Sequence, residues 1–266
     1  MNYLLKEDPD VARIIQQEEA RIENTLDLIA AENHAPRSIL EAQGSIFSTK
    51  AAEGYPGHRF HAGCIFADEL ESLAIKRAQR LFGADHANLQ PHSGVSANLA
   101  VYFSVLNVGD RILSMKLSHG GHLSHGDPSS VTSQCFHFKH YGLDAQTEQI
   151  DYDEMRDMAR AFKPQMIIAG ASSYPRLIDY QLTTDIAKSV SAYLLVDMAH
   201  IAGLVAAGVI PSPVPHADFV PFTTYKPLNG GRGGMILCKK EHARKISKTI
   251  FPGAQGTPSL NLLAAK

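Results

Sequence analysis

The sequence predicts an α/β fold in which helices cover both faces of a mostly parallel sheet. Short apolar runs alternate with helical stretches along most of the chain, as in layered α/β proteins. The chain has 266 residues, which is enough for one large core or two small ones. Ser172, Asp197 and Lys226 lie just past three of the apolar runs. Ligands bind at the carboxyl ends of strands in such folds, so we expect these side chains to share one crevice.

Each element is predicted from its local pattern. A charged segment without Gly or Pro predicts a helix over 10–22, and apolar residues at helical spacing predict another over 66–82, closed by Gly83. Residues 33–64 are rich in Gly, Pro, His and Ser, and predict a loop with short helical pieces. Further along we expect strands at 111–114, 166–169, 193–196, 219–223 and 235–238, and helices at 95–106, 153–162 and 183–191.

The composition is that of an ordinary globular protein. Because the net charge is only −2, neither nucleic acid nor an anionic membrane is favoured as a partner. The chain shows no signal-peptide pattern and no apolar run long enough to span a bilayer. Cys64, Cys135 and Cys238 lie far apart, without metal-type spacing. We therefore expect no metal site and a reducing, cytoplasmic location.

Asp197 and Lys226 together give the strongest functional signal. Asp197 ends one apolar run and Lys226 follows another. Pyridoxal phosphate enzymes need a lysine that holds the cofactor as a Schiff base. They also need a carboxylate that keeps the pyridine nitrogen protonated, so that the ring can draw electrons from the substrate carbon. Both residues are common in these positions, so the pair gains its meaning from the motifs around it.

A Ser-Gly pair, Ser93 and Gly94, opens the predicted helix over 95–106. Such a pair offers backbone N–H groups, a hydroxyl and the positive end of the helix dipole, which suits a phosphate group. The simpler interpretation is that Ser93 is an ordinary N-cap. Both interpretations can hold at once.

A glycine-rich loop over 118–126 carries three histidines, His119, His122 and His125. Imidazole is a common metal ligand, but no Cys, Asp or Glu joins the histidines within the loop. One imidazole could instead stack on a planar cofactor ring. A solvent-exposed loop with incidental histidines is the third interpretation, and the residues alone do not choose between them.

Two further loops carry isolated charges. Glu53 stands in a turn-rich loop, where it could act as a general acid or base, although a solvated surface carboxylate is the commoner case. Arg232 stands among four glycines over 230–234, where the backbone is expected to approach another group closely or to adopt positive φ.

In this order, the motifs resemble the serine hydroxymethyltransferase family of fold-type-I pyridoxal phosphate enzymes. The resemblance covers nearly the whole chain, in segments 28–33, 53–57, 90–94, 117–122, 168–172, 196–207 and 251–256. It implies an N-terminal helical arm over 1–35 and an aminotransferase-like large domain over 36–266. The family's C-terminal small domain is expected to lie outside this chain.

The resemblance implies a catalytic role for four residues. Lys226 would hold pyridoxal 5'-phosphate as a Schiff base, and Asp197 would pair with its pyridine nitrogen. His122 would stack on the ring face. Glu53 would serve as the proton-handling carboxylate, reaching in from a second subunit.

The resemblance assigns the remaining cofactor contacts to other motifs. Ser93 and Gly94 would hold the phosphate. Ser172 and His200 would lie near the phenolic oxygen of the cofactor. Gly256, in the last matching segment, would also contact the cofactor.

The chain departs from the family's pattern at several positions. The changed positions are Ala31, Ala51, Phe60, His61, Tyr225, Pro227 and Thr257. The family usually has serine at 31, tyrosine at 51, 60 and 61, histidine and threonine on either side of the lysine, and glycine at 257. Groups acting on the cofactor ring remain, while groups around the substrate and the phosphate have changed. This pattern predicts a divergent member with an altered substrate pocket.

The resemblance implies transfer of a hydroxymethyl group between serine and glycine with tetrahydrofolate as the acceptor, by a homo-oligomer with shared active sites. One alternative is a folate-independent aldolase or transaldolase acting on a β-hydroxy-α-amino acid. Another is a cofactor-binding homologue that needs a partner chain for activity. The family's carboxylate-binding arginine belongs to the C-terminal domain and is not matched by Arg232, so a separate chain supplying that domain is also a candidate partner.

Overall fold

The computed structural model describes residues 2–266, with side chains from residue 3 onward. Its contacts divide the chain into two compact units, one ending at Glu32 and the other comprising Asn33–Lys266. The boundary expected after residue 35 and the further domain outside the chain stay predictions.

The first unit contains α1 (Asn2–Glu7) and α2 (Pro9–Asn24). Asp8 caps α2, because its side chain accepts a hydrogen bond from the backbone N–H of Val11, and Pro9 occupies a first-turn position where its missing N–H costs nothing. The helix predicted over 10–22 is therefore confirmed.

The second unit is built on a mixed sheet. Within the described residues the sheet has seven strands in the order β3-β9-β8-β7-β6-β4-β5. The pairs from β8 through β7, β6 and β4 to β5 are parallel, whereas β9 is antiparallel to both β8 and β3. The strands are β3 (His86–Asn88), β4 (Arg111–Met115), β5 (His137–Tyr141), β6 (Met166–Ala169), β7 (Tyr193–Val196), β8 (Phe219–Thr223) and β9 (Gly234–Cys238).

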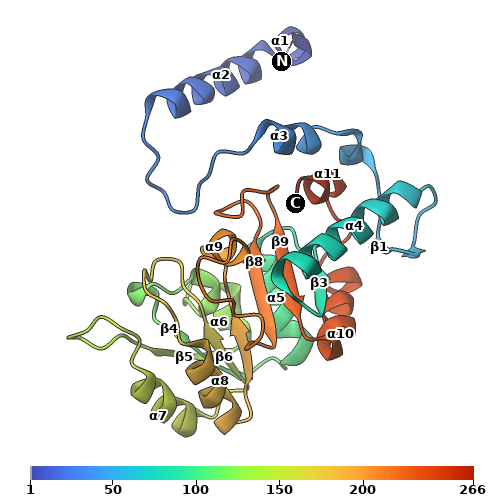
Figure 1. Cartoon of the computed structure of the whole chain (residues 1–266). Coiled ribbons are helices and arrows are strands. Elements are labelled where there is room, and N and C mark those ends of the chain that lie inside the picture. The colour runs from blue at the N-terminus through green and yellow to red at the C-terminus, as the bar shows by residue number, and fades with distance from the viewer. Residues whose placement is uncertain (1) are drawn as a thin grey trace. The chain divides into compact units, whose positions relative to one another are not determined.

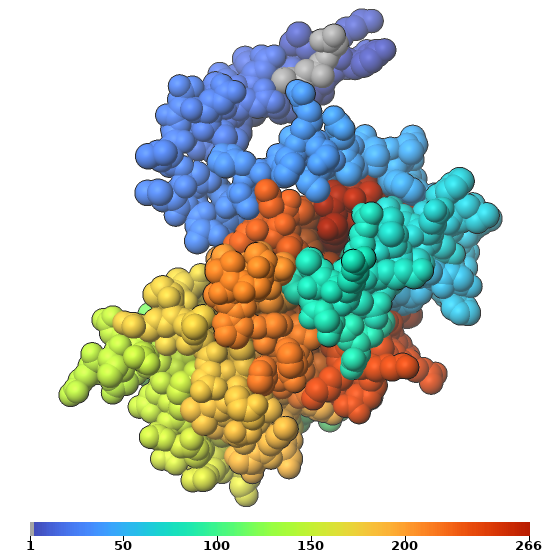
Figure 2. Space-filling view, viewed as in Figure 1, coloured from blue at the N-terminus to red at the C-terminus, as the bar shows by residue number. Residues whose placement is uncertain are grey.

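Helices cover both faces of this sheet, as Figure 1 shows. One core lies between the sheet and α4 (Ile65–Phe82), α7 (Tyr152–Phe162), α8 (Tyr180–Ser189), α9 (Ala202–Ala206) and α11 (Leu260–Ala265). The other lies between the sheet and α5 (Gly94–Val105) and α10 (Ala243–Lys248). In the space-filling view of Figure 2, the yellow-green to gold atoms of α7 and α8 and the teal atoms of α4 cover the visible face. The predicted fold class, a mostly parallel sheet with helices on both faces, is confirmed.

The remaining elements are short. They are α3 (Arg37–Gln43), α6 (Val131–Cys135), the 3-10 turns Ile46–Thr49, Leu117–His119, Leu123–His125 and Lys240–His242, and a wide turn at Thr249–Ala254. A two-stranded hairpin pairs β1 (Gly54–Tyr55) with β2 (His58–Arg59). The expected loop over 33–64 thus contains helical pieces, as predicted, and a hairpin that was not predicted.

The five predicted strands are confirmed within one residue, and β3 and β5 were missed. The confirmed strands are almost entirely buried. Strands buried on both faces have continuous apolar sequences, which is the pattern that predicted them. In contrast, β5 is the edge strand and reads His-Phe-Lys-His-Tyr, and β3 has only three residues. Gly83 ends α4 in the left-handed conformation, as predicted.

None of the helices in the described part of the chain is long and apolar enough to cross a membrane. The three cysteines are all free thiols, so no disulfide contributes to the stability of the second unit.

Candidate functional site

A cavity of about 100 Å³ opens at the carboxyl ends of the central parallel strands. It brings together seven of the nine residues to which the resemblance gives a catalytic or cofactor-binding role. Its lining is Ser93, Gly94, Val95, His122, His125, Ala171, Ser172, Asp197, Ala199, His200, Thr223, Tyr225 and Lys226. Glu53 and Gly256 do not line it.

Adjacent parallel strands explain why Ser172, Asp197 and Lys226 meet. β6, β7 and β8 are neighbours in the sheet, so their carboxyl ends lie at one edge. Gly170, directly after β6, has φ +102°, and a Cβ on it would lie 2.1 Å from the carbonyl oxygen of Asp197. Only glycine therefore lets the chain after β6 pass so close to Asp197.

Asp197 is held by three hydrogen bonds. Oδ2 accepts from Asn98 Nδ2 at 2.9 Å and from His125 Nε2 at 3.1 Å, and Oδ1 accepts from the backbone N–H of Ala199 at 3.0 Å. Burial by itself raises the pKa of this carboxyl. The hydrogen bond and charge of His125, together with the other two donors, outweigh burial and lower the pKa well below its usual range. The carboxylate is thus fixed as an anion.

Lys226 presents a buried amine to the cavity, with 6% of the residue exposed. Its Nζ lies 2.9 Å from Nε2 of His200, and its carbonyl oxygen accepts from Asn33 Nδ2 at 3.1 Å. Burial lowers the pKa of Lys226, and the charge of Asp197 only partly opposes this. Burial likewise lowers the pKa of His200, and the charge of Lys226 adds to the effect. Both groups are therefore biased toward their neutral forms.

The N-terminus of α5 forms another wall. The Ser93 hydroxyl accepts from the backbone N–H of Ser96 at 3.1 Å, and the Ser96 hydroxyl accepts from the backbone N–H of Ser93 at 2.8 Å. This reciprocal capping box confirms that Ser93 is the N-cap. A Cβ on Gly94 would lie 2.7 Å from Cγ2 of Thr223, so glycine lets the helix start pack against the end of β8. The phosphate-binding role of the pair stays a prediction.

The three histidines of the glycine-rich loop have separate surroundings. His119 Nδ1 accepts from the backbone N–H of Leu143 at 2.9 Å, outside the cavity. His122 lines the cavity, and its Nδ1 accepts from the backbone N–H of Ser124 at 3.2 Å, so a neutral ring carries its proton on Nε2. His125 is buried against Asp197. Among residues 2–266 no group of His, Cys, Asp or Glu is arranged to hold a metal ion.

Asn98 and His125 are the site residues that the sequence did not single out for a role. Asn98 Nδ2 donates to Asp197 and lies 2.9 Å from the hydroxyl of Ser124, which lies 2.8 Å from His122 Nδ1. Asn98 thereby connects Asp197 to the loop that carries His122. A signal was present, because Asn98 follows Gly94 by one helical turn on an otherwise apolar face that includes Ala97 and Val101.

Glu53 and Gly256 belong to a second cluster, around Thr257. The Thr257 hydroxyl accepts from the backbone N–H of Ala52 at 2.7 Å, and the Thr257 carbonyl oxygen lies 3.2 Å from His92 Nε2. His61 Nε2 lies 2.7 Å from Glu53 Oε2. The side chain of Glu53 is 29% exposed while its Oε2 atom is buried, so the carboxylate is only partly solvated.

A buried ion pair fixes the hairpin that carries Glu53. The guanidinium of Arg59 donates to Glu71 Oε2 at 2.6 Å and to Asp68 Oδ1 at 2.7 Å, both on α4. Gln90 Nε2 donates to Glu71 Oε1 at 2.8 Å and to the Gly54 carbonyl oxygen at 2.9 Å. Because Gln90 lies in the segment that leads to Ser93, this network joins the hairpin to the start of α5.

Arg232 has a local partner. Its guanidinium carbon lies 3.9 Å from the centre of the Tyr225 ring, a cation–π contact across the turn that follows Lys226. The surrounding glycines allow close packing, since a Cβ on Gly231 would lie 2.5 Å from the Cβ of Ala265. The backbone at 230–234 thus lies close to another segment, as the glycines there predicted.

The groups in the cavity fit pyridoxal phosphate. The cavity offers a buried amine, a fixed carboxylate, an imidazole and the free N–H groups of a helix start. Two buried atoms on residues that line the cavity, Thr223 Oγ1 and His125 Nδ1, have no hydrogen-bond partner within the described residues. Buried polar atoms normally have partners, so unmet hydrogen-bonding capacity at this site indicates that a polar molecule completes it.

Comparison with known proteins gives two findings. A family model described as serine hydroxymethyltransferase matches residues 4–266. A curated serine hydroxymethyltransferase from Coprothermobacter proteolyticus is 56% identical over 265 residues, an alignment that covers 100% of this chain and 64% of that protein. The chain therefore spans less than two thirds of the length of that curated relative.

Proposed function

From the premise that this chain belongs to the serine hydroxymethyltransferase family, we propose that it forms the cofactor-binding part of a pyridoxal-phosphate-dependent enzyme. The proposed reaction moves a hydroxymethyl group between serine and glycine, with tetrahydrofolate as the one-carbon acceptor. The observation that carries this proposal is that Asp197 and Lys226, 29 positions apart in sequence, line one cavity with Ser93 and His122.

Each side chain of the cavity has a proposed task. When bound, pyridoxal phosphate supplies an electron sink for the substrate carbon. Asp197 keeps a proton on the ring nitrogen, since its hydrogen bonds fix it as an anion. Lys226 holds the cofactor covalently, and its lowered pKa keeps more of the amine in the neutral, nucleophilic form.

The walls of the cavity orient the cofactor. We propose that the N-terminus of α5, with Ser93 and Gly94, binds the phosphate group through free N–H groups and the helix dipole. His122 lies against the ring face, and Ser172 and His200 act on the phenolic oxygen. His200 also lies close enough to exchange a proton with the Lys226 amine.

Glu53 and Gly256 act in a second copy of the chain, according to this proposal. They share one cluster around Thr257 and do not line the cavity of their own chain. In a homo-oligomer with shared sites, this cluster would complete the cavity of the neighbouring subunit. The carboxylate-binding arginine of the family has no match among these 266 residues, and we propose that sequence outside them supplies it.

Cofactor uptake tests the first half of the proposal. The purified chain mixed with pyridoxal phosphate should develop a visible absorbance band that borohydride removes by fixing the cofactor to Lys226. Lys226→Ala should take up no covalent cofactor, whereas the exposed Lys240→Ala should behave as wild type. A wild-type chain that stays colourless would contradict every cofactor-based interpretation.

Product analysis tests the second half. Serine should yield glycine and a folate product only when tetrahydrofolate is present. Release of an aldehyde at the same rate without folate would instead support the aldolase alternative, which the changed residues Phe60 and His61 favour. Activity that appears only after a second polypeptide is added would support the alternative that a partner chain completes the site.

A further inference from the structure

The hairpin holds a carboxylate and an imidazole against each other. Glu53 directly precedes β1 and His61 follows β2 by one residue. Gly54 pairs with Arg59 in the hairpin, and the backbone N–H of Phe60 donates to the carbonyl oxygen of Glu53 at 3.0 Å. This register brings His61 Nε2 to 2.7 Å from Glu53 Oε2. The pair is therefore fixed by backbone pairing and not by two free side chains.

Among the described residues, His61 carries the titratable group that lies against this carboxylate oxygen. Glu53 Oε2 is buried and lies 2.7 Å from His61 Nε2, and the hydroxyl of Thr257 also acts on the carboxylate. The His61 side chain is 48% exposed and that of Glu53 is 29% exposed. Water therefore reaches the imidazole more easily than it reaches the buried oxygen.

Two further contacts hold the hairpin in place. The Thr257 hydroxyl accepts from the backbone N–H of Ala52, next to Glu53, and the Phe60 ring packs edge-on against Phe251 with centroids 5.4 Å apart. Three of these residues, Phe60, His61 and Thr257, differ from the family's pattern. The departures thus gather around one carboxylate.

Because its pKa is lowered, Glu53 needs a neighbouring group that can take up the proton it receives. Its own backbone amide lowers the pKa of Glu53, and the charge of His61 and the hydroxyl of Thr257 lower it further against the opposing effect of burial. A carboxyl whose pKa is lowered holds a proton poorly near neutral pH. Imidazole is the side chain that gains and loses a proton in that range.

We propose that His61 is a positioning residue that relays protons between Glu53 and water. The proton that Glu53 receives at Oε2 moves to His61 Nε2, which leaves a carboxylate and an imidazolium. The imidazolium then releases its Nδ1 proton to water, and proton exchange with water returns the ring to the Nδ1–H tautomer before the next transfer. This relay rests on the proposed role of Glu53, and the first test below does not depend on that role.

Chemical labelling tests the pair in the chain without cofactor. Diethyl pyrocarbonate reacts with neutral imidazole, and mass spectrometry gives the rate at each histidine. His61 should react about threefold or more faster in Glu53→Gln than in wild type, since the carboxylate lies against Nε2 and shields it from the reagent. The exposed His58, the first residue of β2 in the same hairpin, should react equally in both and serves as the control. An unchanged His61 rate, or no reaction in either form, overturns the relay.

Turnover tests what the pair does. His61→Ala should lower kcat by about tenfold or more while the KM for serine and the cofactor band stay close to wild type. Added imidazole should restore activity to His61→Ala and leave Glu53→Gln inactive, because only the former lacks the relay group. Activity of His61→Ala equal to wild type, or no rescue, overturns the proposal. A wild type without turnover is expected if the carboxylate-binding arginine comes only from sequence outside these residues, and the labelling result then decides whether the pair exists.

Discussion

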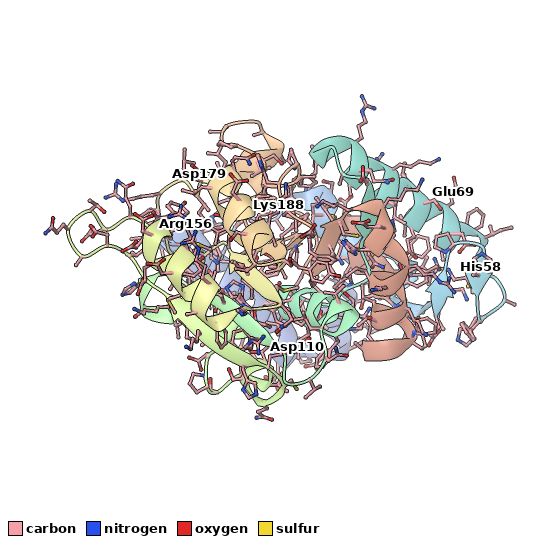
Figure 3. The ribbon with its side chains drawn as sticks, turned by 90° about the horizontal axis from the view of Figure 1, so that it is seen from below. His58, Glu69, Asp110, Arg156, Asp179 and Lys188 are labelled. Carbon is pink, nitrogen blue, oxygen red and sulfur yellow. The ribbon has the colours of Figure 1, made fainter. Side chains whose placement is uncertain are left out.

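The cavity around Asp197 and the hairpin pair of Glu53 and His61 are held in opposite ways. Asp197 accepts hydrogen bonds from three separate parts of the second unit, which are the side chain of Asn98 on α5, the side chain of His125 in a 3-10 turn, and the backbone N–H of Ala199 after β7. The hairpin pair comes from one short segment, and its charged groups are partly exposed. Figure 3 shows His58, in β2 of that hairpin, at the opposite end of the unit from Arg156 of α7.

The difference indicates that the cavity tolerates substitution less well than the hairpin does. Side chains of the cavity are tied to the sheet, so a change at one of them disturbs several elements. The hairpin can exchange residues such as His61 or Phe60 at small cost, because its backbone is fixed by β pairing and by Arg59. We therefore expect the cavity to determine cofactor chemistry and the hairpin to determine what reacts with it.

The largest expected effect is at the anchor of the hairpin. Glu71→Ala should lower the free energy of unfolding by about 3–5 kcal/mol, because it leaves the buried guanidinium of Arg59 without its main partner. The exposed Glu69→Ala on the same helix, labelled in Figure 3, should change stability by less than about 0.5 kcal/mol. Urea unfolding of the two variants is the measurement. Equal midpoints would show that the hairpin does not depend on this ion pair.

A smaller effect is expected at the support of Asp197. Asn98→Ala removes one hydrogen bond to a buried carboxylate, a loss of about 1.5–3 kcal/mol. Pyridoxal phosphate should therefore bind about tenfold or more weakly, as measured by titration of the visible band. Asn107→Ala, at an exposed position after α5, should bind as wild type. Unaltered affinity in Asn98→Ala would mean that His125 and the Ala199 amide suffice to hold Asp197.

The third prediction concerns pH and Lys226. Because burial lowers the pKa of Lys226, its neutral amine should persist at lower pH than that of an ordinary lysine. The rate of covalent cofactor capture, followed by absorbance from about pH 6 to pH 10, should level off below the usual lysine range, and each unit by which the pKa is lowered should raise the rate at neutral pH about tenfold. A rate that still rises at about pH 10 would contradict a desolvated amine.

The sequence predicted the buried parts of the molecule better than its edges. Strands β6, β7 and β8 were predicted at their observed bounds, because strands buried on both faces read as continuous apolar runs. The edge strand β5 alternates exposed and half-buried residues and was missed. The hairpin was missed since two-residue strands carry too little pattern to be recognised.

Within the site, the sequence indicated the residues that directly follow strands and missed those that depend on packing. Asp197 and Lys226 could be located because strand ends are visible in the apolar pattern. The contact of His125 with Asp197 joins positions 72 apart, and that of Asn98 joins positions 99 apart, so neither follows from local pattern. The pair of Glu53 and His61 depends on a hairpin register that was not predicted.

The smallest expected effect separates the two interpretations of Ser93. As an N-cap, Ser93→Ala should cost about 1 kcal/mol of stability, whereas Ser93→Asp should cost little, since aspartate caps helices as well as serine does. As part of a phosphate site, Ser93→Asp should bind pyridoxal phosphate more weakly than Ser93→Ala, because it places a carboxylate beside an anion. Thermal unfolding and cofactor titration of both variants give the answer. If Ser93→Asp binds the cofactor as tightly as wild type, the phosphate lies elsewhere and Ser93 is a cap alone.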